Sequence, residues 1–115
     1  MADCIFCKIA GGEINAGVVK KTADFVAFRD IKPVAPTHVL IVPVAHLGAV
    51  RDAEGEAGHR LLGRLLAFAA EVAAELGLDS GGYRIVANTG RDGGQSVDHL
   101  HLHVLGGRPM TWPPG

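Results

Sequence analysis

The sequence lacks the features that mark secreted, membrane-spanning and polymer-binding proteins. Its 115 residues carry a formal net charge of -1, so it offers no long-range attraction to nucleic acid or to an anionic membrane. No apolar run approaches the ~18 residues of a membrane span, and the N-terminus shows no basic segment followed by an apolar stretch. We therefore expect a cytoplasmic protein, with no membrane and no polymeric nucleic acid among its partners.

Cysteine is scarce, and both cysteines fall in one Cys-x-x-Cys motif, at Cys4 and Cys7. In a reducing compartment this spacing indicates metal or redox chemistry and not a structural disulfide. A redox role is disfavoured because the motif does not follow a strand in a βαβ unit. Two small buried thiols remain the plain alternative.

The chain also lacks internal repeats, low-complexity tracts and an interdomain linker. Its length fits one domain over residues 1–115, with a single core. An active site that encloses a large substrate must then be shared with a second copy, or else be shallow.

The hydrophobic pattern predicts an α+β fold with an antiparallel sheet. Apolar residues recur at helical spacing over residues 57–76, opposite charged ones, and Gly77 follows where a helix should end. Two prolines in the connection 30–36 exclude continuous strand pairing there. The other predicted elements are a short N-terminal helix capped by Asp3 and ending near Ala10, and strands at 25–28, 39–42, 83–87 and 99–105.

The most informative segment is His99 to Leu105, in which histidines alternate with apolar residues. Strand geometry sends His99, His101 and His103 to one face and the intervening apolar side chains to the other. Three imidazoles in a row suit either metal ligation or nucleophilic and proton-transfer chemistry near neutral pH. We expect the functional site at this row.

A glycine-rich loop, residues 90–96, lies directly before the histidine row. Glycines allow backbone N–H groups to converge on phosphate oxygens, although such loops are more often plain turns. The loop has neither the ending of a P-loop nor the spacing of a dinucleotide fingerprint, and we expect no organic cofactor. A phosphate held here would lie against the imidazoles, one of which could attack phosphorus.

The same chain contains the ligands of a structural zinc site. Cys4 and Cys7 supply half of a tetrahedral set, and spacing favours His46 and His99 as the other half. A catalytic zinc held by all three histidines of the row is a weaker hypothesis, because it leaves both cysteines without partners.

Several single residues have both a structural and a functional interpretation. Asp30 is either a turn former or an acceptor for sugar hydroxyls. Asn88 could donate to a phosphate or bond the local backbone, and His38 fits a core histidine within a strand. Trp112 has no apolar neighbours in its tail, so we expect it to pack elsewhere on the fold or on a partner chain.

The histidine pattern resembles the defining motif of the histidine triad (HIT) superfamily. The wider match, to its histidine triad nucleotide-binding branch, covers nearly the whole chain. It comprises residues 30–31 with 35–38, 93–97, 101–108 and 112–115. The resemblance implies a HIT-like homodimer that binds purine nucleotides and hydrolyses adenosine or guanosine 5'-monophosphoramidates and acyl-adenylates. The alternative is a nucleotide sensor or protein-interaction module with little turnover.

The resemblance also implies roles for individual residues. The middle histidine, His101, is the nucleophile, and it forms a nucleotidyl-histidine intermediate within the triad of His99, His101 and His103. Asp98 departs from the aromatic residue often found at its position, which leaves substrate preference open. The other implied roles are phosphate binding by His103, Gly94, Gln95 and Ser96, with Ser96 also placing a proton near the leaving nitrogen; ribose binding by Asp30; base contacts by Phe6, Phe28 and Ile31; a place near phosphate and ribose for Asn88; support of the row by His38; and zinc ligation by Cys4, Cys7, His46 and His99.

Overall fold

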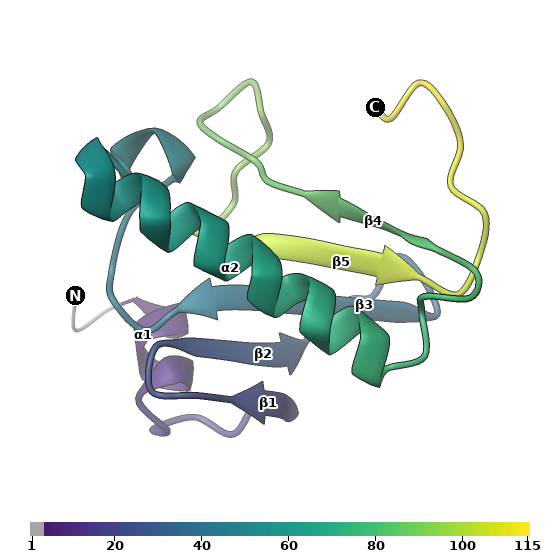
Figure 1. Ribbon diagram of the computed structural model, residues 1–115, viewed down its shortest axis with the longest axis horizontal. Helices are drawn as coiled ribbons and strands as arrows, with labels where there is room; N and C mark the ends of the chain where they lie inside the picture. The colour runs from purple at the N-terminus through teal and green to yellow at the C-terminus, as the bar shows by residue number, and fades with distance from the viewer. Residues whose placement is uncertain (1–3) are drawn as a thin grey trace.

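The computed structural model describes residues 4–115, which form two α-helices, five strands and one short 3-10 turn (Figure 1). In chain order they are α1 (Ile5–Ala10), β1 (Val18–Lys21), β2 (Phe25–Arg29), β3 (Thr37–Pro43), η1 (Val50–Asp52), α2 (Gly55–Glu75), β4 (Tyr83–Val86) and β5 (Leu102–Gly106). The predicted α+β class is therefore confirmed.

The five strands make one sheet in the order β1-β2-β3-β5-β4, with every neighbouring pair antiparallel. The central pair, β3 and β5, places Leu40 opposite His103. Strand β1 was not predicted from the sequence, because its four residues include two lysines at an edge of the sheet.

Helix α2 covers one face of the sheet, as its amphipathic pattern predicts. Its apolar side packs with side chains from the strands in one core cluster. The helix ends in a Schellman motif, in which the N–H of Leu78 donates to the carbonyl of Ala73 (2.9 Å) and that of Gly77 to Ala74 (3.0 Å). Gly77 has a φ of 77°, which favours glycine, so the predicted stop is confirmed.

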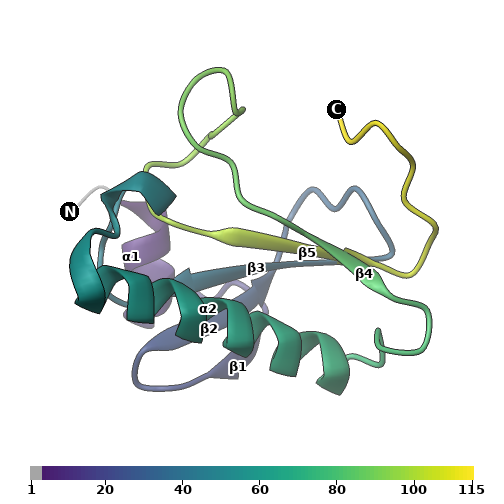
Figure 2. The same ribbon diagram turned by 45° about the horizontal axis from the view of Figure 1, so that its top comes forward.

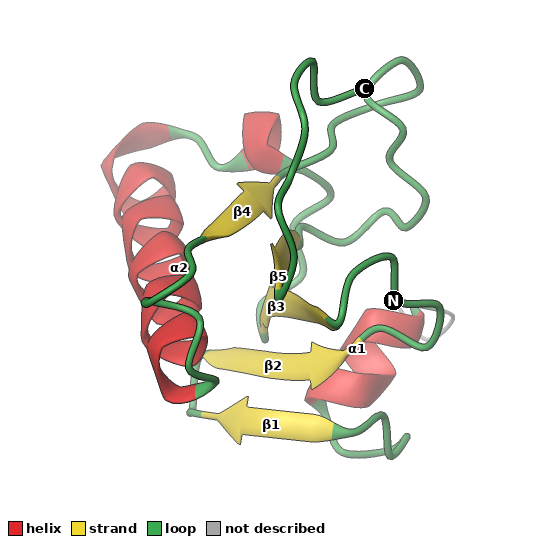
Figure 3. Cartoon of the chain, turned by 90° about the vertical axis from the view of Figure 1, so that its right-hand side faces the viewer, coloured by secondary structure: helices red, strands yellow, loops and turns green. Residues whose placement is uncertain are grey.

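Helix α1 lies on the opposite face of the sheet (Figure 3). Its buried residues Phe6, Ile9 and Ala10 pack on the other face of β2 and β3. Asp3, the predicted N-cap, lies outside the described residues. Cys4 is the residue before the helix, and its Sγ accepts a hydrogen bond from the backbone N–H of Cys7 at 3.4 Å.

The histidine run is only partly regular strand, because β5 begins at Leu102. His99 to His101 precede the strand but keep the predicted alternation, since Leu100, Leu102 and Val104 all join the core under α2. Within residues 4–115, no helix has both the length and the apolar character that crossing a membrane requires.

Candidate functional site

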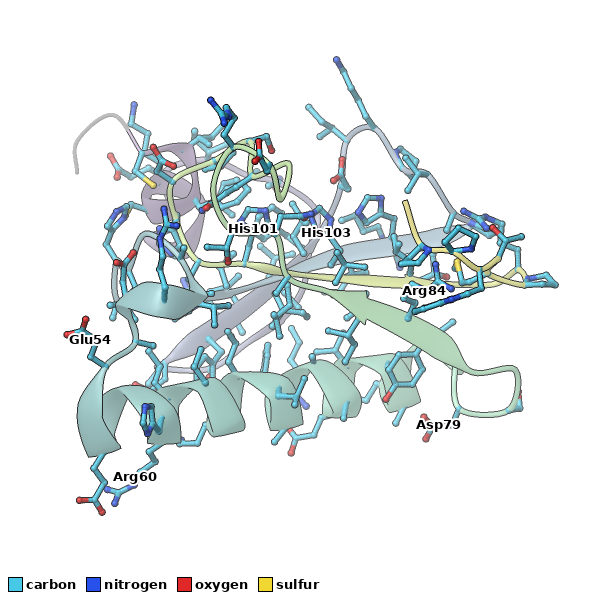
Figure 4. All side chains as sticks on the ribbon, turned by 90° about the horizontal axis from the view of Figure 1, so that it is seen from above. Glu54, Arg60, Asp79, Arg84, His101 and His103 are labelled. Atoms are coloured by element: carbon cyan, nitrogen blue, oxygen red, sulfur yellow. The ribbon has the colours of Figure 1, made fainter. Side chains whose placement is uncertain are left out.

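The histidine row lies on the face of the sheet turned away from α2. Figure 4 shows His101 and His103 projecting from this face, toward the loops that rise on the same side in Figure 2. Their ring centroids are 5.1 Å apart. His99 and His101 are buried, whereas His103 is partly accessible.

Hydrogen bonding assigns the tautomer of His101. Its Nδ1–H donates to the backbone carbonyl of His99 at 2.7 Å. A neutral imidazole has one N–H and one lone pair, so Nε2 carries the lone pair. In the neutral form of His101, Nε2 is therefore the nitrogen that is available to a ligand in the pocket.

A second chain of hydrogen bonds assigns His103. The backbone N–H of Val34 donates to Nδ1 of His38 at 3.2 Å, which puts the proton of His38 on Nε2. That proton is donated to Nδ1 of His103 at 2.9 Å, and Asp30 Oδ2 lies 3.4 Å from the same nitrogen of His38. His103 consequently keeps its own proton on Nε2, where it can donate to a phosphate oxygen.

Both imidazoles of this pair resist protonation. Burial, with smaller effects from His101 and His38, lowers the pKa of His103 from 6.5 to about 4. Burial also lowers the pKa of His38, although the Asp30 carboxylate opposes that shift. At neutral pH the pair is therefore uncharged, as the assigned tautomers require.

The lowered pKa of His103 predicts a pH-dependent stability. The unfolded chain takes up a proton on His103 near pH 6.5, but the folded chain does so only near pH 4. The stabilising contribution is complete above pH 6.5 and is lost as the pH falls toward 4. The free energy of unfolding, measured by urea titration between pH 7.5 and 4.5, should therefore fall more steeply for the wild type than for His103→Asn.

The variant His59→Asn is the matched control, because it makes the same change at an exposed histidine. Its stability profile should run parallel to that of the wild type. Parallel profiles for the wild type and His103→Asn would contradict the argument.

The glycine-rich loop is held in place by the side chain of Gln95. Its Oε1 accepts a hydrogen bond from the backbone N–H of Gly90 at 3.0 Å. Its Nε2 donates to the carbonyls of Gly48 at 2.7 Å and Val97 at 3.0 Å. The amide of Gln95 thus fixes the shape of the loop, a role that the sequence did not indicate.

Asn88 and two glycines complete the loop. Asn88 Nδ2 donates to the carbonyl of Gly93 at 2.7 Å, which is the local bonding that the sequence left as an alternative. A Cβ atom on Gly93 would lie 2.3 Å from the carbonyl oxygen of Thr89, and Gly94 has a φ of 75°. The turn therefore requires glycine at both positions.

A pocket of about 260 Å³ lies between α1, the end of β2 and the histidine row. It brings together seven of the predicted residues: Phe6, Phe28, Asp30, Ile31, Ser96, His101 and His103. The lining does not include His38, His99, Asn88, Gly94 or Gln95. Sequence reasoning missed the remaining lining residues, Ile5, Ile9, Ala16, Arg29, Leu40 and Val97, most of which carry only an ordinary apolar signal.

A larger cavity, of about 520 Å³, lies at the far end of the sheet beside Leu78 and Arg108. Glycines make up much of its lining, which has no imidazole, thiol or carboxylate. Of these two pockets, the smaller one holds the imidazoles of the histidine row.

The four predicted metal ligands converge at the N-terminal end of α1. The Nδ1 atoms of His46 and His99 are 3.1 Å apart, and Cys7 Sγ lies 3.3 Å from the first and 3.5 Å from the second. Cys4 Sγ lies 3.4 Å from Nδ1 of His99. All four ligand atoms lie within 4.8 Å of one another.

The donor set and its surroundings fit zinc. Tetrahedral bonds of about 2.3 Å to sulfur and about 2.0 Å to nitrogen place ligand atoms roughly 3.3 to 3.8 Å apart, close to the separations observed. His99 Nε2 donates to the carbonyl of Pro43 at 2.9 Å, which turns the lone pair of Nδ1 toward the thiols. Burial lowers the pKa of His99, so the imidazole is neutral, as a ligand must be.

Comparison with known proteins agrees with this geometry. The family model for the HIT domain matches residues 11–110. The chain belongs to the HIT family, and the resemblance predicted from its sequence is confirmed.

Two curated relatives bear on the chemistry. The purine nucleoside phosphoramidase of Escherichia coli (strain K12) is 44% identical over 108 residues, which cover 94% of this chain and 90% of the relative. The 14 kDa zinc-binding protein of Zea mays is 50% identical over 112 residues, or 96% of this chain and 87% of the relative.

Solved structures share the fold. A HIT family hydrolase from Legionella pneumophila Philadelphia 1 superposes with a TM-score of 0.93 at 50% identity, covering 98% of this chain and all (100%) of that one. The α+β arrangement around the histidine row is thus that of a HIT family hydrolase.

Proposed function

We propose that the protein is a purine nucleoside phosphoramidase that cleaves the P–N bond of adenosine or guanosine 5'-monophosphoramidates. The observation that carries this proposal is His101, which lines the pocket with Nδ1–H bound to a backbone carbonyl and a lone pair on Nε2. The similarity to the phosphoramidase of Escherichia coli supports the substrate class.

In the first step, Nε2 of His101 forms a bond to the α-phosphorus and the P–N bond to the leaving amine breaks. The leaving nitrogen needs a proton, which the Ser96 hydroxyl at the pocket relays from solvent. The imidazole ring becomes cationic, and the carbonyl of His99 stabilises that charge through the 2.7 Å bond to Nδ1–H. Nε2–H of His103 donates to a phosphate oxygen.

In the second step, water attacks the same phosphorus and the P–Nε2 bond breaks. The nucleoside monophosphate leaves, one proton passes to solvent, and His101 regains its lone pair. Mass spectrometry of protein quenched shortly after mixing with adenosine 5'-phosphoramidate tests the mechanism. We expect a gain equal to one adenylyl group, located on His101, and turnover with no adduct would count against a covalent intermediate.

The pocket walls indicate how the nucleoside binds. Phe6, Phe28 and Ile31 offer apolar surface to a purine and few groups that read its edge, so we expect adenine and guanine to be accepted similarly. Asp30 accepts a hydrogen bond from the backbone N–H of Lys32 at 2.8 Å. A carboxylate has about four acceptor positions, which leaves Asp30 able to bind ribose hydroxyls.

Replacing Asp30 should therefore weaken sugar discrimination. For Asp30→Asn we expect kcat/KM toward the ribonucleoside substrate to fall about 10- to 100-fold, the range for a lost hydrogen bond to a charged group. The 2'-deoxy substrate should change much less. Asp79→Asn, at an exposed position after α2 and away from the pocket, is the matched control and should behave as the wild type. Equal losses for both sugars would contradict the assignment.

We also propose that Cys4, Cys7, His46 and His99 bind one structural zinc ion. When bound, the metal would supply a closed tetrahedral set of bonds and no catalytic water. The maize zinc-binding relative supports this hypothesis. Both cysteines are free thiols in the structure, which accords with the reducing cytoplasm that we propose as the protein's location.

We propose finally that two copies form a homodimer through the β4 edge of the sheet and α2. Strand β4 ends the sheet, and its four residues are half-buried rather than fully covered. Leu66 on α2 and Trp112 in the tail are 51% and 82% exposed, so Trp112 packs little on its own chain and is available to a partner. Sedimentation at micromolar concentration should give twice the 12.0 kDa chain mass, and a monomer alone would refute the proposal.

A further inference from the structure

Phe6 joins the metal-ligand cluster to the nucleotide pocket. It lies between Cys4 and Cys7 in the sequence and is buried on α1. Its ring centroid lies 5.1 Å from that of His101, 6.0 Å from that of His99 and 5.4 Å from that of Phe28, each in an edge-to-face arrangement. One side chain therefore contacts a metal ligand, the nucleophile and the pocket wall.

We propose that zinc and nucleotide binding are energetically coupled through Phe6, so that each ligand raises the affinity for the other. The inference rests on the proposed function, because it takes the pocket beside His101 as the nucleotide site. It assigns Phe6 the role of a positioning residue, in addition to its contact with the base.

The position of α1 depends on contacts outside the helix. Six residues are too few to form a stable helix alone, so α1 is held by its buried side chains and by its thiols. Zinc would tie Cys4 and Cys7 to His46 and His99 on the sheet side. Binding the metal would therefore fix the backbone on both sides of Phe6.

The same short helix forms a wall of the pocket, because Ile5, Phe6 and Ile9 all line it. A nucleotide base packed on that wall would hold α1 against the sheet from the other side. The two ligands then favour one arrangement of α1. Linkage requires their effects to be reciprocal, and coupling between sites of this kind is typically about fivefold or more.

The first measurement needs no variant. Zinc affinity of the full chain is determined by competition with a chromophoric chelator, with and without saturating adenosine monophosphate. We expect the nucleotide to tighten zinc binding about fivefold or more. The affinity for adenosine monophosphate, measured by calorimetry, should be higher for the zinc-loaded than for the zinc-free protein by the same factor.

Two variants then locate the coupling. Phe6→Leu keeps an apolar side chain but removes the ring that touches His99 and His101. We expect the coupling factor, which is the ratio of the zinc affinities with and without bound nucleotide, to fall toward one. Phe68→Leu makes the same change at a buried phenylalanine of α2, on the opposite face of the sheet, and should keep the full factor.

The outcomes separate this proposal from the proposed function. Equal zinc affinity with and without bound nucleotide would overturn the coupling and leave the proposed activity standing. Full coupling in Phe6→Leu would overturn the role of Phe6, because the link would then run through the carbonyl of His99 or through folding of the whole chain. If the zinc-loaded protein bound no adenosine monophosphate, the nucleotide site and the coupling would both fall.

Discussion

His101→Asn should lower phosphoramidase turnover at least about 1000-fold and abolish the nucleotidyl adduct. Removing a nucleophile removes the covalent route entirely, and losses of this size or larger follow such changes. Asparagine keeps an N–H near the position of Nδ1, so it can still donate to the carbonyl of His99. Binding of adenosine monophosphate should therefore remain within a few-fold of the wild type.

The comparison uses steady-state turnover, adduct mass and calorimetric binding on the same preparations. His59→Asn is again the matched control, because the exposed His59 contacts no part of the site, and it should retain full activity. If His101→Asn turned over the substrate at the wild-type rate, the assignment of His101 as the nucleophile would be wrong. A variant that has lost nucleotide binding as well would assign His101 to the binding site and not to the covalent step.

Removing zinc should lower the melting temperature of the protein by roughly 10–20 °C. A ligand present at about 1000 times its dissociation constant stabilises the folded state by about 4 kcal/mol, and for a domain of this size each kcal/mol corresponds to several degrees. Thermal unfolding with and without a strong chelator measures the shift. Elemental analysis of purified wild-type protein should find about one zinc per chain.

The histidine ligands offer a matched pair for this test. His46→Asn removes one ligand and should lose most of the zinc, with a melting temperature close to that of the chelated wild type. His59→Asn makes the same change away from the cluster and should keep both zinc and stability. Less than about a tenth of an equivalent of zinc in the wild type would leave Cys4 and Cys7 as ordinary thiols.

Much of the fold could be predicted from local patterns. The periodicity of α2 located the helix to within two residues at each end, because its apolar stripe and Gly77 are both visible in the sequence. The alternating run fixed which side chains of β5 face the core. The start of β5 was placed too early, because strand pairing depends on β3 and β4 as well as on alternation.

The candidate site, too, could be predicted only in part from the sequence. The histidine row and the Cys-x-x-Cys motif were visible because their members lie within a few residues of one another. The hydrogen bonds that set the histidine tautomers and the shape of the loop could not be predicted, because they join residues far apart in the sequence. His38 and His103 are 65 positions apart, and Gln95 and Gly48 are 47 apart. Gln95 was predicted to hold phosphate, but its side-chain amide bonds to the backbone and its own backbone N–H donates to the carbonyl of Gly90 at 3.0 Å. Phosphate binding by Gln95 stays a prediction.

The hydrogen bonds by which Gln95 holds the glycine-rich loop have a consequence for the rate at which the proposed nucleotide substrate would bind. Three hydrogen bonds from one amide hold the loop before any ligand arrives. The chain entropy lost when this loop becomes ordered is therefore lost during folding, and it does not reduce the free energy of ligand binding. If the pocket binds the proposed nucleotide, association would need no slow closure of this segment, and its rate would be set by diffusional encounter. The affinity would also not be reduced by a low population of binding-competent loops.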